Sequence, residues 1–194
     1  EKDKVIYKEE LFPYWQGKSM KDSIECNIGD DIKASVKEKI VKLNQTDKGQ
    51  GHIIPDFETV LKNGLGHLIE LINKKLRENP DNEFYQASKI VLDASARHIL
   101  RYAELAEEMI KTETDITRKE DLKKIAEISR KISTGKPESF HEALQLLWYV
   151  CVILQYESNA SSISLGRVDQ YLNDFYVSDL KKNIPENELK EYLK

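Results

Sequence analysis

Cysteine is scarce in this chain, and no apolar run is long. The only two cysteines, Cys26 and Cys151, lie far apart among 194 residues. This spacing favours reduced thiols over a disulfide framework, although a single disulfide stays open. The apolar run around residues 150–154 is too short to cross a membrane, and the opening sequence EKDKVIYKEE lacks the apolar segment of a signal peptide. We therefore expect a cytoplasmic protein that neither binds nor crosses a membrane.

Neither sign of charge dominates the chain. It has 30 Lys and Arg residues against 34 Asp and Glu residues, and the net charge of −4 is spread along the sequence. A nucleic-acid-binding protein is expected to carry a basic patch, and no such patch is present. The charged fraction of 33% and the apolar fraction of 40% are ordinary for a soluble helical protein. We therefore expect no nucleic-acid partner.

Several catalytic and ligand-binding motifs are also missing. The sequence contains no glycine-rich phosphate loop, no GxSxG nucleophile elbow and no CxxC pair. Metal-ligand spacing such as HExxH is absent among the four histidines, which are His52, His67, His98 and His141. Cys151 lies within an apolar helical stretch, where a thiol usually behaves as a small hydrophobic side chain. We therefore expect no metal site and no cofactor held by these residues.

Apolar residues recur at helical spacing through most of the chain. Capping boxes at Ser19, Thr117 and Ser139 each have an acidic residue three positions later, which predicts a helix start at each. A long helix is predicted over 83–112. Its inner side is expected to carry Phe84, Ala87, Val91, Ala94, His98, Leu105 and Met109. The only plausible strand is 162–167. The sequence therefore predicts a mainly α structure with six or seven helices and at most one or two short strands.

The region around which the chain is organised is residues 137–176. A nearly all-apolar helix over 139–155 leads into a polar cluster at 157–162, followed by the sequence SLGRVDQY. A helix this apolar is expected to be buried on most sides, so the polar cluster after it would reach the interior and form a site. The alternative is a helix end at which these side chains satisfy the last carbonyls.

Two further positions allow both a structural and a functional interpretation. Arg167 and Asp169, one residue apart, could form an ion pair or a helix cap instead of a site. His52 stands between a glycine and an apolar pair, before Pro55. It could cap the helix that follows, or face a cavity as a proton donor. The residues alone leave these alternatives open.

Three strings carry a family resemblance: GHIIPDFETVLKNGL, KPESFHEALQLLWYV and LQYESNASSISLGRVDQYLNDFY. Together with the stretch from Leu11 to Lys18, they resemble the pyruvate formate-lyase domain of the glycyl radical enzymes, most of all its dehydratase and lyase branch. The resemblance implies a ten-stranded α/β barrel wrapped in helices. Residues 1–194 would be its N-terminal helical portion, ending as the first barrel strand begins at about 162–167. The C-terminal barrel and the glycyl radical domain would be absent.

The resemblance also implies a chemistry. In the family, a glycyl radical relays to a cysteine thiyl that attacks a small-molecule substrate. The radical is installed by an S-adenosylmethionine-dependent iron–sulfur activating enzyme, and the intact enzyme is expected to be a homodimer. Cys26 and Cys151 do not match the thiyl cysteine, and the glycyl loop is absent, so this stretch alone is expected to be an inactive fragment. The alternative is a non-catalytic helical binding module, or a degenerate or split family member.

Some residues of the family's substrate pocket do match positions in this chain. The resemblance implies catalytic roles for His52 and Asp169, and substrate contacts for Ser161 and Ser162. Ser161 stands where the diol dehydratases commonly have a histidine, which weighs against glycerol or propanediol as the substrate. We expect His52, Ser162 and Asp169 to come near one another in the fold. A histidine could protonate a leaving hydroxyl, and a carboxylate could orient it.

Overall fold

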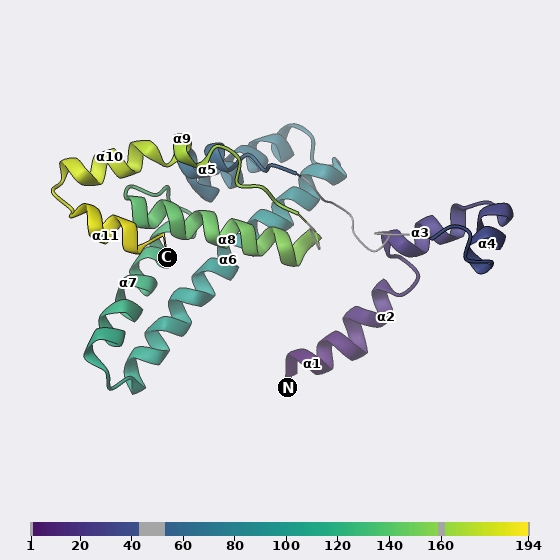
Figure 1. The fold of residues 1–194 in the computed structure, drawn as a ribbon, viewed down its shortest axis with the longest axis horizontal. Helices are drawn as coiled ribbons and strands as arrows, with labels where there is room; N and C mark the ends of the chain where they lie inside the picture. Colours follow the sequence, from purple (N-terminus) through teal and green to yellow (C-terminus); the bar gives the residue numbers. More distant parts are fainter. Residues whose placement is uncertain (1, 43–52, 159–161, 194) are drawn as a thin grey trace. The chain divides into compact units, whose positions relative to one another are not determined.

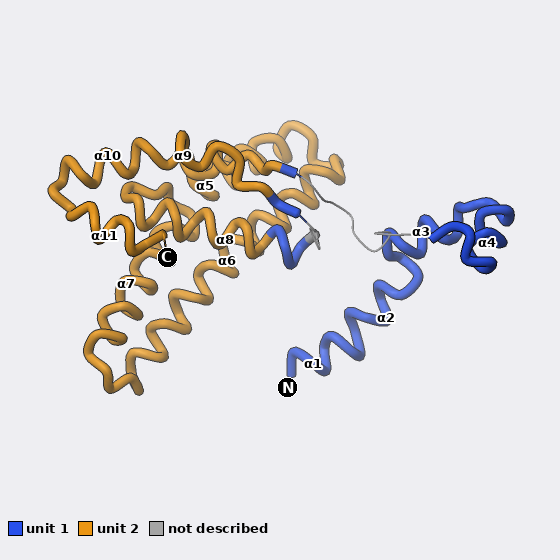
Figure 2. The backbone as a smooth tube through the Cα atoms, viewed as in Figure 1, with its two compact units in different colours: residues 1–53, 154–163 blue, residues 54–153, 164–194 orange. Residues whose placement is uncertain are grey.

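The computed structural model describes residues 2–42, 53–158 and 162–193. The chain divides into two compact units: residues 1–53 with 154–163, and residues 54–153 with 164–194 (Figure 2). Helices dominate the described residues, and their one β pairing is an isolated parallel bridge between Ile53 and Ile163. The prediction of a mainly α structure is therefore confirmed. None of the helices in the described ranges has the length and apolar character needed to span a bilayer.

The first unit contains a series of short helices. They are α1 (Lys2–Ile6), a π-helical turn η1 (Tyr7–Leu11), α2 (Phe12–Trp15), α3 (Met20–Asn27) and α4 (Asp30–Lys37) (Figure 1). The predicted capping box at Ser19 is present: the Asp22 amide donates to Ser19 Oγ at 3.1 Å, and the Ser19 amide donates to Asp22 Oδ2 at 3.1 Å. Two of the orphan amides of α3 are thereby satisfied.

The second unit is built from longer helices. They are α5 (Phe57–Glu78), α6 (Glu83–Thr112), α7 (Ile116–Ile132), α8 (Phe140–Ser158), α9 (Val168–Tyr171), α10 (Asn173–Lys181) and α11 (Glu186–Glu191). Figure 1 shows α6 and α7 as a long helical hairpin. The bounds predicted for the long helix are those of α6, where Asn82 caps the first turn by accepting from the Tyr85 amide.

The predicted start of α7 is wrong by two residues. Asp115, not Thr117, caps this helix, because its carboxylate accepts from the Arg118 amide at 2.7 Å. A charged acceptor at a helix N-terminus forms a stronger hydrogen bond than a hydroxyl does. Its negative charge also interacts favourably with the positive end of the helix dipole. Thr117 therefore lies within the first turn.

The face of α6 that is buried also differs from the prediction. Its buried residues are Ser95, Ile99, Ala103 and Ala106, all of them absent from the expected inner side. Phe84 and Leu105 are 73% and 55% exposed. The small side chains let α7 approach closely, and Ala106 packs with Leu122 and Ala126. The apolar stripe of α6 is thus wider than the surface that α7 and its neighbours cover.

Helix α8 is buried on one face in its first half, not on most sides. Phe140, Ala143, Leu146 and Tyr149 are almost fully buried, whereas Trp148 is 64% exposed. The buried face is held to α7 by a hydrogen bond of 2.8 Å between the Tyr149 and Ser129 hydroxyls. The prediction failed because composition alone does not show which neighbours cover an apolar helix.

Two glycines of α5 allow it to meet the turn between α7 and α8. Gly64 has φ +78°, and an added Cβ would lie 2.6 Å from the Gly135 carbonyl oxygen. The Gly66 amide donates to the Thr134 carbonyl at 2.8 Å, and a Cβ on Gly66 would overlap the same oxygen. Real Cβ atoms do not approach backbone this closely, so both positions need glycine. Close packing therefore explains glycines that would otherwise weaken the helix.

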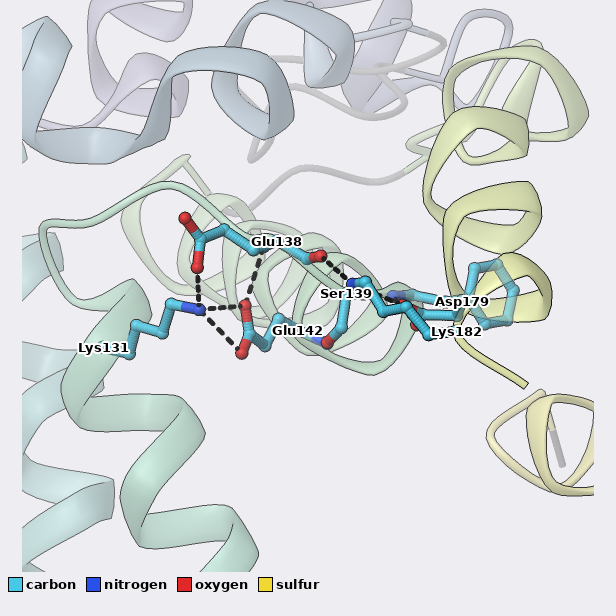
Figure 3. A network of polar contacts seen from close by, with 7 residues as sticks. Lys131, Glu138, Ser139, Glu142, Asp179 and Lys182 are labelled. Carbon is cyan, nitrogen blue, oxygen red and sulfur yellow. Dashed lines mark hydrogen bonds and ion pairs between the residues drawn. The ribbon is translucent and has the colours of Figure 1, made fainter. Parts of the chain in front are cut away.

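The start of α8 is fixed by the buried carboxylate of Asp179, which is only 1% exposed (Figure 3). Asp179 Oδ2 accepts from the Phe140 amide at 2.8 Å, and Asp179 Oδ1 accepts from Lys182 Nζ at 3.0 Å. Lys182 Nζ also donates to the Glu138 carbonyl at 3.2 Å. One side chain from α10 thus satisfies an orphan amide of α8.

A second polar group connects α8 to α7. Lys131 Nζ donates to Glu138 Oε2 at 2.7 Å and to Glu142 Oε1 at 3.0 Å (Figure 3). The Glu142 amide donates to Ser139 Oγ at 3.2 Å, as the predicted cap requires, while the Glu142 carboxylate accepts from the Glu138 amide at 2.7 Å. The first turn of α8 is therefore tied to α7 on one side and α10 on the other.

We predict that Asp179→Ala lowers the free energy of unfolding by about 1–3 kcal/mol, because it leaves the Phe140 amide buried without its acceptor. Asp179→Asn keeps an acceptor oxygen and should cost less. Lys182→Met leaves the buried Asp179 carboxylate without its cation, so it should also destabilise the fold, although the Phe140 amide keeps its acceptor. Urea unfolding of the four proteins checks this, and wild-type stability of Asp179→Ala would contradict it.

Candidate functional site

The polar segment after α8 meets the segment before α5 at the isolated bridge. Ile53 pairs with Ile163 in parallel, and the Ile53 amide donates to the Ser162 carbonyl at 3.2 Å. Among the described residues, the predicted strand over 162–167 is reduced to this single pairing. The left-handed backbone of Gly166, φ +68°, interrupts an extended conformation there.

Two of the four predicted site residues, His52 and Ser161, lie outside the described residues. Ser162 is described and partly buried, and its carbonyl is bonded to Ile53, the residue that follows His52 in the sequence. More than one hundred residues separate the two bonded positions. The expected convergence of His52 with Ser162 stays a prediction, and this hydrogen bond next to His52 supports it.

The segment from Ser164 to Tyr171 is held by short-range hydrogen bonds within the second unit. The Gly166 amide donates to Ser164 Oγ at 3.2 Å, and the Tyr171 hydroxyl donates to the Leu165 carbonyl at 2.7 Å. A Cβ added to Gly166 would lie 2.9 Å from Ile54 Cγ2. The sequence pattern predicted no role for Ser164, Gly166 or Tyr171, although a glycine inside a predicted strand is itself a signal of close backbone approach.

Asp169 forms a paired ionic contact with Arg167 at the start of α9. Arg167 Nη2 lies 3.2 Å from Asp169 Oδ2, and Nε lies 3.3 Å from Oδ1. Both side chains are mostly exposed, at 71% and 66%. Hydrogen bonding from Arg167 lowers the pKa of Asp169, and the same contact raises the pKa of Arg167. Of the alternatives left open by the sequence, the structure contains the ion pair and not the helix cap.

Asp169 is also one of the residues around a small hollow of about 250 Å³. The rest of the lining is mostly apolar and consists of Phe140 on α8, Val168 on α9, Leu172 between α9 and α10, Asn173 and Tyr176 on α10, and Leu193 after α11. An ionised carboxylate beside an apolar surface suits a ligand with one polar and one apolar part. His52 and Ser162 are not among the lining residues.

A second cavity, of about 520 Å³, is lined by α8, by Leu165, and by Tyr192 and Leu193 just after α11. His141 and Tyr192 form one wall, with their rings stacked at 4.1 Å and 15°. Burial lowers the pKa of His141 and raises the pKa of Cys151, so the imidazole is favoured neutral and the thiol protonated. Burial and a hydrogen bond to Glu188 raise the pKa of Tyr192 to about 12. The cavity therefore has no activated nucleophile, in line with the interpretation of Cys151 as a hydrophobic side chain.

A metal site would require several ligating side chains close together. Within residues 2–42, 53–158 and 162–193, no group of three or more His, Cys, Asp or Glu side chains is placed to hold a metal ion. Ser162, Arg167 and Asp169, the described polar residues of the candidate site, offer hydrogen bonding and charge.

We predict that Arg167→Gln raises the pKa of Asp169 back toward its ordinary value of 3.8, because the largest cause of its lowering is removed. A lowered carboxyl pKa means that the ion pair is complete above 3.8 and is lost as the pH falls through the lowered value. Titration of the carboxyl carbons by NMR measures this. Asp56 is the internal control, because its pKa is lowered by hydrogen bonds from Thr59 and not by Arg167. An unchanged Asp169 pKa would contradict the assignment.

The chain matches a known protein family over its whole length. The family model described as pyruvate formate lyase-like matches residues 1–194. The (2S)-3-sulfopropanediol dehydratase of Klebsiella oxytoca is 37% identical over 185 residues, which cover 90% of this chain and 22% of that protein. The trans-4-hydroxy-L-proline dehydratase of Clostridioides difficile is 31% identical, with coverage of 95% of this chain and 24% of the relative. The chain thus spans about a quarter of the length of these relatives.

Solved structures agree with the sequence relatives. A glycyl radical enzyme from Archaeoglobus fulgidus superposes with a TM-score of 0.82 at 33% identity, over 99% of this chain and 26% of that one. The B12-independent glycerol dehydratase of Clostridium butyricum superposes with a TM-score of 0.83 at 30% identity, over 95% and 24%. Because the family model matches every residue and solved glycyl radical enzymes share the helical arrangement, the chain belongs to the pyruvate formate lyase-like family of glycyl radical enzymes.

Proposed function

We propose that residues 1–194 are the N-terminal helical portion of a glycyl radical dehydratase or lyase that acts on a small polar metabolite. The observation that carries this proposal is the similarity over 90% or more of the chain, at 30% identity or more, to enzymes of that class. The names of these relatives include a sulfopropanediol, a hydroxyproline and glycerol as substrates or ligands. All three compounds carry a hydroxyl group that dehydration would remove.

The proposed roles of this chain's residues follow from what the elimination of a hydroxyl requires. A leaving hydroxyl departs more readily when a positioned acid protonates it, and we assign that role to His52. Asp169 is a carboxylate with a lowered pKa, so it can accept a hydrogen bond from a substrate hydroxyl or orient the donor. Ser161 and Ser162 supply further hydroxyl contacts. In this proposal a substrate hydroxyl replaces one of the two hydrogen bonds that Arg167 donates to Asp169.

The radical step itself needs groups that we place outside these residues. A glycyl radical, installed by an S-adenosylmethionine-dependent iron–sulfur activating enzyme, and a cysteine thiyl would supply it when the enzyme is complete. Neither Cys26 nor Cys151 is assigned the thiyl role, because neither matches the position of the family's thiyl cysteine. The apolar helices of this chain would help to keep water from the reaction. A homodimer in the cytoplasm, with a small-molecule substrate, completes the proposal.

The first test is activity of the full-length enzyme with its activating enzyme. The protein-centred radical is measured by electron paramagnetic resonance, and turnover is measured on sulfopropanediol, isethionate, hydroxyproline, glycerol and propane-1,2-diol. His52→Ala and Asp169→Asn should leave the radical yield intact and lower turnover by roughly 10²-fold or more, as for loss of an acid–base group. The matched controls are His67→Ala and Asp81→Asn, at exposed positions on α5 and in the turn before α6. They should leave turnover unchanged.

Two results would contradict the proposal at different levels. Full turnover in both His52→Ala and Asp169→Asn would reduce these residues to structural roles. A full-length protein that carries no radical after activation would favour the alternative of a non-catalytic or degenerate family member.

The second test concerns the chain by itself. We predict that residues 1–194, incubated with the activating enzyme and S-adenosylmethionine, give no glycyl radical signal, because the glycyl loop of the family is not in this sequence. The full-length enzyme under the same conditions is the positive control. A protein-centred doublet from residues 1–194 would show that the radical forms at a position we have not assigned.

A further inference from the structure

Gly166, in the segment after α8, lies beside Ile54, in the segment before α5, within the second unit. Its backbone is left-handed, with φ +68°, and a Cβ there would lie 2.9 Å from Ile54 Cγ2. Two requirements therefore coincide at one residue: a conformation that side chains rarely adopt and a neighbour that leaves no room for one. The Cγ2 atom belongs to a β-branched side chain, which is stiff at χ1 and moves aside at a cost.

The residues around Gly166 hold it in this position. The Gly166 amide donates to Ser164 Oγ, and the Leu165 carbonyl accepts from the Tyr171 hydroxyl of α9. Burial raises the pKa of Tyr171, so its hydroxyl stays protonated and remains a donor at neutral pH. Loop 164–166 is thus hydrogen-bonded to α9 through Leu165, and its Gly166 lies beside the Ile54 side chain.

Ile54 is the residue after Ile53, and Ile53 forms the bridge to Ile163 and the hydrogen bond to Ser162. Along the sequence, the contact at Gly166 and the bridge therefore connect the same two segments, 53–54 and 162–166. We propose that Gly166 is a positioning residue: its missing side chain lets loop 164–166 pack on Ile54 and so keeps Ser162 bonded to Ile53. This inference rests on the proposed function, in which Ser162 contacts the substrate.

The simplest competing explanation is that Gly166 serves only its own backbone conformation. Gly17 separates the two explanations, because it has φ +78° and nothing within 4 Å of an added Cβ. Gly17→Ala therefore imposes the same kind of backbone strain without a collision. Ile54→Leu removes the atom that the new Cβ would overlap and leaves the backbone strain in place, because leucine keeps the apolar volume but has no Cγ2 atom.

The first measurement does not depend on activity. Amide hydrogen exchange of Ile53, followed by NMR in the chain of residues 1–194, should accelerate by tenfold or more in Gly166→Ala. It should be unchanged in Gly17→Ala and partly restored in the double variant Gly166→Ala, Ile54→Leu. Unchanged exchange at Ile53 in Gly166→Ala would overturn the inference, whatever the enzyme's substrate. Equal acceleration in Gly17→Ala would overturn it as well.

The second measurement uses the activated full-length enzyme. Gly166→Ala should raise KM several-fold with an unchanged radical yield. The double variant Gly166→Ala, Ile54→Leu should have a KM between that of Gly166→Ala and that of the wild type. A wild-type enzyme that turns over no substrate would defeat the proposed function, while the exchange result would still decide the role of Gly166. Unaltered KM and kcat in Gly166→Ala, in an enzyme that is active, would show that the packing contact has no part in substrate binding.

Discussion

The arrangement of the second unit depends on one buried carboxylate, that of Asp179. Without it the first amide of α8 would be buried with no acceptor, and α10 would lose its hydrogen bond to that helix. Lys131 and its two glutamates hold the same turn to α7, and the glycines of α5 pack on the residues just before it. Helices α10 and α7 therefore meet the first turn of α8, and α5 meets the turn that precedes it.

The apolar surface of the chain is larger than its described contacts cover. Phe84 and Leu105 on α6 and Trp148 on α8 are more than half exposed, beside faces that are packed. The chain spans about a quarter of the length of the relatives it matches. Its helical arrangement is nonetheless shared with solved glycyl radical enzymes at TM-scores above 0.8, because the contacts that define it are internal to the helices around α8.

Local chemistry made much of the fold predictable. The bounds of α6 follow from a turn and an Asn cap, and the caps at Ser19 and Ser139 follow from hydroxyls with acidic residues three positions later. The buried faces of α6 and α8 were not predictable, since both helices are apolar beyond the covered side and only tertiary packing selects the face. The same holds for Asp179, whose role appears only when residues 39 positions apart are brought together. At the candidate site, the family resemblance implied that the segments around His52 and Ser162 come near each other. The described bridge joins Ile53 and Ile163, the residues that follow these two in the sequence, and the roles of the side chains remain a proposal.

The central claim is that segments distant in sequence form one substrate pocket in a glycyl radical enzyme. A crystal structure of the full-length enzyme with its substrate bound tests this most directly. The account predicts that His52, Ser162 and Asp169 each place a polar atom within about 2.6–3.2 Å of the substrate or of a water bound to it. A substrate held entirely by other residues, with Asp169 still paired to Arg167, would contradict it.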